Sequence, residues 1–240
     1  MTNIVPLNSQ THRSLRVNGA ASARHGDNQR FVQVVVGEFP LLVVHYPILF
    51  SKDADTGAFF CGAMLGFDQG ENLFLAEGTE HQGYRPLNLQ RMPFYTAGED
   101  LAIDLDHSRV GAEQGQALFT EAGQPTMYLE SIMQTFRDLK PGSEVTRIFI
   151  ATLLQHRLIE PVDIGAQFDD GSRRDLRDLY TINQSVLKDL PDAIVLELFR
   201  RGYLRLIYLM IASLKQIAEL AKRKNALMLR GSESLSARGG

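Results

Sequence analysis

The sequence is poor in cysteine and carries little net charge, and each of these features excludes a class of function. Its one cysteine, Cys61, excludes an intrachain disulfide and a thiolate-rich zinc site. Phe60 and Gly62 flank this cysteine within an apolar run, so we expect an unreactive, buried thiol. A formal net charge of -3 at pH 7 provides no positive field for nucleic acid, which we therefore do not expect as a partner.

Long apolar runs and the common cofactor motifs are also missing. Residues 1–30 contain no apolar block of the kind found in signal peptides. The most apolar stretch, residues 203–214, is shorter than the ~20 residues that a membrane span needs, and it contains Arg205. No phosphate-binding loop, dinucleotide fingerprint or nucleophile elbow occurs. We expect a cytoplasmic, soluble protein with no membrane span, no cofactor and no bound metal.

The first half of the chain is predicted to form strands. The segment 51–57, Ser-Lys-Asp-Ala-Asp-Thr-Gly, separates two apolar runs and is typical of a β-hairpin connection. More strands are predicted than a simple alternation of strands and helices would supply, which favours an antiparallel or mixed sheet. The predicted strands cover residues 31–36, 41–50, 58–67, 89–96 and 101–105.

The second half changes to a helical period. Pro141-Gly142 follows one helical pattern and Ser143 can cap the next, so we predict an αα-hairpin. A late β-hairpin is then predicted from residues 162–168 and 175–182. Helices follow at 183–187, at 192–201 and, as one long helix, at 203–224.

These patterns predict an α+β fold. No long linker interrupts residues 1–230, which favours a single domain, and the polar, glycine-rich residues 231–240 are predicted to be a disordered tail.

Some polar residues could form a metal or catalytic site, and each is compared with a structural role. Asp104 and Asp106 share a strand face and could meet a cation, but a solvated strand end explains them more simply. His45 has no local partner for a catalytic relay, and we interpret it as a core or turn histidine. An enzyme would require distant groups, such as His45, Asp104 and His156, to meet in one pocket.

Binding surfaces are predicted at two places besides the pair His45-Tyr46. Cationic and aromatic residues alternate around residues 91–95, a mixture that is enriched at protein interfaces. Positive charge also gathers near residues 200–205, where the alternative is a solvated helix face. The candidate binding residues are His45, Tyr46, Arg91, Phe94, Tyr95, Arg200, Arg201 and Arg205.

The sequence resembles the bacterial SapC family along most of its length. The motifs that carry this resemblance are Glu38-Phe39-Pro40, Tyr46-Pro47-Ile48, Asp53 with Thr56-Gly57, Gly70-Glu71-Asn72-Leu73-Phe74, Arg91-Met92-Pro93-Phe94, Glu160-Pro161-Val162, Leu179-Tyr180-Thr181-Ile182 and Gly202-Tyr203-Leu204. The resemblance implies no catalytic group.

The resemblance suggests two settings. The family's name implies an association with bacterial surface layers. Similar proteins are also often encoded near TonB-dependent receptors and near flavoproteins that resemble tryptophan halogenases. We expect a non-catalytic accessory protein that binds a peptide or protein and serves such a neighbour. The alternatives are a structural component of a surface layer and an enzyme whose site is assembled from distant polar residues.

Overall fold

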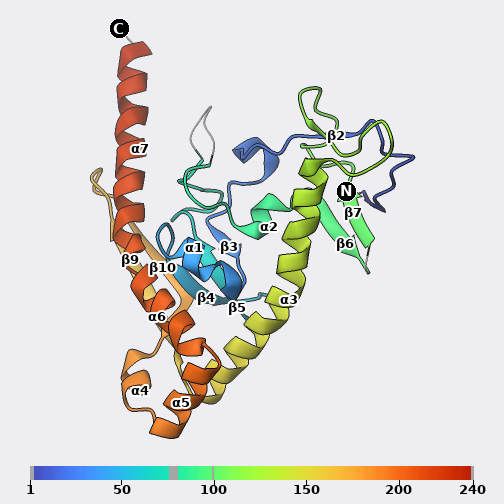
Figure 1. Cartoon of the computed structure of the whole chain (residues 1–240). Coiled ribbons are helices and arrows are strands. Elements are labelled where there is room, and N and C mark those ends of the chain that lie inside the picture. Colours follow the sequence, from blue (N-terminus) through green and yellow to red (C-terminus); the bar gives the residue numbers. More distant parts are fainter. Residues whose placement is uncertain (1–2, 76–80, 99, 239–240) are drawn as a thin grey trace. The chain divides into compact units, whose positions relative to one another are not determined.

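A computed structural model describes residues 3–75, 81–98 and 100–238 (Figure 1). The chain contains two compact units, and each is discontinuous in sequence. Unit 1 comprises residues 1–28 and 75–141, and unit 2 comprises residues 29–74 and 142–240. The mixture of helices with antiparallel strands confirms the predicted α+β class. The assignment of residues 1–230 to a single domain stays a prediction.

Unit 1 is built around a small antiparallel sheet. Its strand order is β1 (Ile4–Pro6), β7 (Asp100–Asp104) and β6 (Phe94–Ala97), so the first strand of the chain pairs with a distant one. A second pair joins β2 (Arg16–Val17) to β8 (Gln116–Ala117). The short helices η1 (Ala23–His25) and α2 (Leu87–Gln90) complete it. The buried core residues are Val17, Phe94, Ile103, Leu118, Leu129 and Ile132.

Unit 2 contains a five-stranded sheet in which every pair is antiparallel. The order is β3 (Phe31–Gln33), β5 (Phe59–Met64), β4 (Ile48–Lys52), β10 (Arg173–Ile182) and β9 (Ile159–Gln167). The predicted hairpins β4–β5 and β9–β10 are both present. Cys61 is fully buried in β5, as predicted, and burial raises the pKa of its thiol.

Several helices accompany this sheet in unit 2. η2 (Val36–Glu38) leads into α1 (Phe39–Leu42), and α4 (Gln184–Lys188), α5 (Asp192–Arg200), α6 (Tyr203–Ser213) and α7 (Gln216–Arg238) follow the late hairpin. α6 packs against α1, β4 and β10. The buried Ser213 hydroxyl accepts a hydrogen bond of 2.8 Å from the Ile48 amide and thereby ties α6 to β4.

The last helix is anchored by a charged group. The Lys224 side chain in α7 is 7% exposed, and its ammonium group donates hydrogen bonds to the carboxylates of Asp68 and Glu71. The rings of Phe67 and Phe168 also lie near it, at 6.0 and 5.0 Å from ring centroid to Nζ. A buried ammonium needs such partners, because an unpaired charge in the interior is costly.

Two predicted strands begin as helices. Residues 41–50 were predicted to be a single strand, but α1 ends at Leu42 and β4 starts only at Ile48. Residues 89–96 likewise divide into α2 and β6. A short apolar run does not distinguish a buried strand from a buried helical turn. Pro40 favours the helix, because its fixed φ suits a first turn.

The predicted αα-hairpin is wrong. A single helix, α3 (Met127–Gln155), runs through Pro141 and Gly142 (Figure 1). Proline within a helix costs about 3 kcal/mol, so the prediction of a break was reasonable from local propensity. Packing on the two sides outweighs that cost: Leu129 and Ile132 lie in the core of unit 1, and Phe149 is fully buried in unit 2.

The carboxyl-terminal predictions are confirmed in part. Asn183 caps α4, and Gly202 has a φ of 73°, which suits the end of α5. The single helix predicted for 203–224 is divided between Ser213 and Gln216. α7 extends to Arg238 and so includes most of the segment 231–240, for which the sequence predicts disorder.

The contrast between Pro141 and Gly142 provides a test of α3. Pro141→Ala should raise the free energy of unfolding by up to about 3 kcal/mol, because it restores a helical hydrogen bond at an exposed position. Gly142→Ala should lower it by roughly 1–3 kcal/mol, since a Cβ there would lie 2.9 Å from Cγ2 of the buried Val35. Urea denaturation of both variants measures these effects. Destabilisation by Pro141→Ala would contradict a continuous helix.

Candidate functional site

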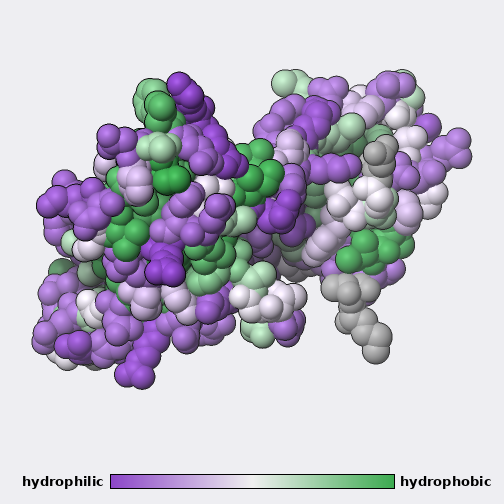
Figure 2. Space-filling model, turned by 90° about the horizontal axis from the view of Figure 1, so that it is seen from below, coloured by the Kyte–Doolittle hydropathy of each residue, from purple (hydrophilic) through white to green (hydrophobic). Residues whose placement is uncertain are grey.

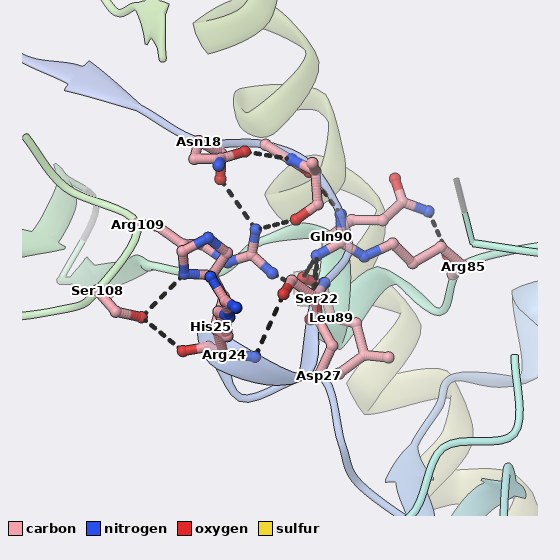
Figure 3. A network of polar contacts seen from close by, with 12 residues as sticks. Asn18, Ser22, Arg24, His25, Asp27, Arg85, Leu89, Gln90, Ser108 and Arg109 are labelled. Carbon is pink, nitrogen blue, oxygen red and sulfur yellow. Dashed lines mark hydrogen bonds and ion pairs between the residues drawn. The ribbon is translucent and has the colours of Figure 1, made fainter. Parts of the chain in front are cut away.

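A buried polar network in the described part of unit 1 joins one carboxylate to two guanidinium groups (Figure 3). Asp27, which follows η1, is 1% exposed and Arg109 is 0% exposed. Asp27 Oδ2 accepts from Nη2 of Arg109 at 2.5 Å, and Oδ1 accepts from Nη2 of Arg85 at 3.1 Å. The carboxylate therefore neutralises one of two neighbouring positive charges.

Backbone carbonyls accept further hydrogen bonds from the Nη atoms of both arginines. Nη1 of Arg109 donates to the carbonyls of Asn18, at 2.9 Å, and Ala20. Arg85 donates to the carbonyls of Gly19, at 2.8 Å, and Leu89, at 2.9 Å. Both arginines thus hold the segment 18–20, which has no strand or helix of its own. The buried positions of Arg109 and Asp27 indicate a structural role for this network.

Three polar atoms of the same region are buried without a hydrogen-bond partner in the structure. They are Nε of Arg85, Nε of Arg109 and the hydroxyl of Tyr128. Burial raises the pKa of Tyr128 above its ordinary value, although the two arginines act in the opposite direction. Buried groups of this kind are usually satisfied by internal water.

Two histidines border the network, and their surroundings disfavour the protonated form. Nδ1 of His25 lies 3.0 Å from the Ser108 hydroxyl, which donates to the Arg24 carbonyl at 3.1 Å. Nδ1 of His107 accepts the backbone amide of Arg109 at 3.2 Å. Burial is the main cause that lowers the pKa of both histidines, and the positive charge of Arg109 lowers it further.

Asp104 has a structural role. Its Oδ1 atom accepts the backbone amides of Asn3, at 2.9 Å, and Asp106, at 3.2 Å, and so closes the turn after β7. Within residues 3–75, 81–98 and 100–238, no group of three or more His, Cys, Asp or Glu side chains could hold a metal ion. Of the hypothetical catalytic set, Asp104 belongs to unit 1, whereas His45 and His156 belong to unit 2.

His45 and Tyr46 have different environments. Tyr46 is fully buried, and its ring packs edge-on against Phe74 at 4.5 Å between centroids. His45 is partly exposed in the turn after α1, and its ring centroid lies 5.8 Å from that of Tyr46. Tyr46 therefore belongs to the core of unit 2, and His45 alone of this pair is accessible.

The predicted cluster at 91–95 is mostly engaged within unit 1. Phe94 is fully buried in the core, so it offers no contact surface. Arg91 donates to Asn88 Oδ1 at 2.8 Å and to the Phe94 carbonyl at 3.0 Å, and its guanidinium lies 5.2 Å from the Tyr95 ring centroid. Burial lowers the pKa of Arg91. This arginine supports the turn between α2 and β6.

The predicted arginines of α5 and α6 are exposed on unit 2. Arg201 is paired with Glu197 at 3.0 Å, donates to the Tyr203 hydroxyl at 3.1 Å and lies 4.6 Å from that ring's centroid. Among the residues that the structure describes, Arg200 and Arg205 have no ion pair. These two cations therefore remain available to a partner.

Large apolar side chains are exposed on the same two packed helices. On α5, Leu196 is 47% exposed and Phe199 is 67% exposed; on α6, Tyr208 is 58% exposed. Figure 2 views the molecule from the side on which Figure 1 draws α5, and hydrophobic surface there alternates with hydrophilic surface. We call Leu196, Phe199, Arg200, Arg205 and Tyr208 the α5–α6 surface.

Sequence reasoning missed the apolar part of this surface. The helical pattern predicted for residues 203–224 places Tyr208 next to Ile207, yet Ile207 is fully buried and Tyr208 is 58% exposed. Helical spacing alone does not separate position 208 from position 207 at the margin of a broad apolar face. Arg205 lies about one helical turn before Tyr208, and this charged residue was the available sign that this side of the helix is exposed.

Comparison with known proteins identifies the family. The family profile described as SapC matches residues 7–220. The chain belongs to the SapC family. No curated protein and no solved structure matches it. None of the helices in the described residues of this SapC-family chain is long and apolar enough to cross a membrane.

The buried network of this SapC-family protein predicts a large cost for removing its carboxylate. Asp27→Asn should lower the free energy of unfolding by about 3–5 kcal/mol, because two guanidinium groups lose their counter-charge in the interior. The control Glu144→Gln breaks an exposed pair with Arg147 and should cost much less, because solvent screens that pair. Chemical denaturation compares them, and equal costs would refute the structural role of Asp27.

The two histidines predict a pH dependence with a defined sign. Their pKa values are lowered in the fold, so the unfolded chain binds protons first as the pH falls below about 6.5. The free energy of unfolding should therefore decrease from pH 7 towards pH 5. In the variant His25→Asn/His107→Asn, denaturation curves measured across this pH range should show a smaller decrease in the free energy of unfolding. An unchanged slope would exclude these groups as its source.

Proposed function

We propose that this SapC-family protein is a non-catalytic accessory that binds a peptide or protein partner through the α5–α6 surface. The observation that supports this most is the exposure of Phe199 at 67% beside cations that have no internal ion pair. Aromatic residues and arginine are enriched at the centres of protein interfaces, where they provide most of the binding energy.

The charge of this surface favours an acidic partner. Arg200 and Arg205 are both exposed, whereas the neighbouring Arg201 is already paired with Glu197. Arginine binds carboxylates through parallel hydrogen bonds, and desolvation by an adjoining aromatic group strengthens such contacts. A partner segment with acidic side chains next to an apolar anchor would match this combination.

The family resemblance adds a setting to this proposal. The partner would belong to a neighbouring system, either a flavin-dependent enzyme that resembles tryptophan halogenases or a TonB-dependent receptor. The accessory would present or hold a segment, and the chemistry would be done by the neighbour. A surface-layer role and a catalytic site remain alternative predictions.

Selection from random peptides displayed on phage tests the proposed surface. We expect the wild-type protein to enrich peptides that combine acidic residues with an apolar or aromatic residue. The variant Arg200→Glu/Arg205→Glu should bind the enriched peptides at least about ten-fold more weakly, because two attractive charge contacts become repulsive. Fluorescence anisotropy with synthetic copies of the peptides measures the affinities.

Two further variants separate charge from apolar contact. Phe199→Ala should weaken binding of the same peptides and change the stability of the protein little, since this side chain is mostly exposed. Arg147→Glu, on the exposed part of α3 in unit 2, serves as the matched charge-reversal control and should leave affinity unchanged. If selection enriches no sequence, or if all variants bind equally, the α5–α6 surface is not the binding site.

A further inference from the structure

A small pocket lies on unit 2, at the irregular part of β10. Its volume is about 140 Å³. Apolar side chains from three strands line it: Phe31 of β3, Met64 of β5, and Leu176 and Leu179 of β10. Ser51 of β4 adds a hydroxyl group. Four of the five strands of the sheet thus contribute to the pocket, which has both apolar and polar residues in its lining.

A β-bulge shapes the pocket. The register of β10 against β9 shifts between Leu176 and Leu179, so Arg177 and Asp178 have no regular partner. Asp178 has a φ of 61°, a left-handed conformation that is unfavourable for most residues other than glycine. The hydroxyl of Ser51 donates to the Asp178 carbonyl at 3.2 Å and holds this conformation. Bulges and backbone outliers occur preferentially at functional sites.

The mouth of the pocket is charged. Arg30, Arg177 and Asp178 all line it and are exposed, which leaves an excess of one positive charge. In the part of the chain that the structure describes, neither Arg30 nor Arg177 forms an ion pair. Nearby cations on the same hairpin, Arg173 and Arg174, are by contrast paired with Asp175 and Asp68.

The volume restricts what can enter. Pockets for complete small-molecule ligands usually measure about 300–1,000 Å³, so a site of this size accepts roughly one side chain. The apolar residues of the lining favour an aliphatic or aromatic side chain, and the two exposed arginines of the lining favour an anionic group attached close to that side chain. In a peptide these two requirements are met together by an apolar residue at the carboxyl terminus.

We propose that this pocket binds the carboxyl-terminal residue of a peptide. The apolar side chain enters the pocket, and the terminal carboxylate is held by Arg30 and Arg177. The Asp178 carboxylate accepts the last backbone N–H of the peptide. Capture of a terminal carboxylate by fixed donors is a recurrent mode of peptide recognition. This inference rests on the proposed peptide binding and adds a second, separate contact to it.

Matched peptides with a free or an amidated carboxyl terminus provide the test. Labelled pools of random sequence, each fixed at its last residue, are titrated with the intact protein and followed by fluorescence anisotropy. We expect the pools that end in leucine, methionine or phenylalanine to bind best. Amidation should lower the affinity of these pools by about ten-fold or more, because it removes the charge that the two arginines recognise.

Variants locate the effect in the pocket. In Arg30→Gln and Arg177→Gln the ratio of affinities between acid and amide should fall towards one, while binding of the amide changes little. Arg147→Gln changes an exposed cation elsewhere in unit 2 and should preserve the ratio. All three side chains are exposed, so we expect the variants to fold normally. Circular dichroism verifies this.

The possible outcomes distinguish this inference from the proposed function. Equal binding of acid and amide, with sensitivity to Arg200→Glu/Arg205→Glu retained, would overturn the carboxyl-terminal site and leave the α5–α6 surface intact. A preference for the acid that survives both pocket variants would also overturn it. Absence of binding by every synthetic pool and by the displayed peptides would overturn both proposals.

Discussion

The bulge in β10 is the constraint on which much of unit 2 depends. After the bulge, Tyr180 pairs with Phe50 in the centre of the sheet. Before it, Arg174 forms an ion pair of 2.6 Å with Asp68, which follows the end of β5, and Phe168 at the hairpin turn packs edge-on against Phe67. β10 therefore pairs with β9 on both sides of the bulge, but it pairs with β4 only after the bulge and contacts the loop after β5 before it. The same loop supplies the carboxylates that hold Lys224, so the position of α7 also follows from the path of β10.

The two units bury charge in opposite ways. In unit 1 the Asp27 carboxylate lies between two guanidinium groups, and backbone carbonyls accept further hydrogen bonds from their Nη atoms. In unit 2 a single ammonium group, Lys224, lies between two carboxylates and beside two aromatic rings. Both arrangements satisfy the requirement that an interior charge be paired and hydrogen-bonded. The pKa of Asp68 is lowered, chiefly by its hydrogen bond from Lys224, as expected for a carboxylate whose charged form the fold favours.

Local patterns predicted the elements that depend on local chemistry. The β4–β5 and β9–β10 hairpins, the Asn183 cap and the glycine stop at Gly202 each follow from a few neighbouring residues. The continuous helix α3 could not be predicted, because burial of Leu129 and Phe149 outweighs the local effect of Pro141. The network of Asp27, Arg85 and Arg109 was also missed. Asp27 is 58 residues from Arg85 and 82 residues from Arg109 in the chain, and no spacing rule relates a carboxylate to cations at such separations.

The distribution of paired and unpaired arginines explains why binding is favoured over chemistry. Arg85, Arg91 and Arg109 in unit 1 direct their donors to backbone carbonyls or to partners within the unit, so their interactions maintain the fold. In unit 2, Arg30, Arg177, Arg200 and Arg205 are exposed, and the described residues provide no ion pair for them. Exposed arginines close to apolar groups can hold an anion, but they transfer no proton near neutral pH because guanidinium does not titrate there. These residues therefore support the proposal that the protein recognises an acidic or carboxylate-bearing segment.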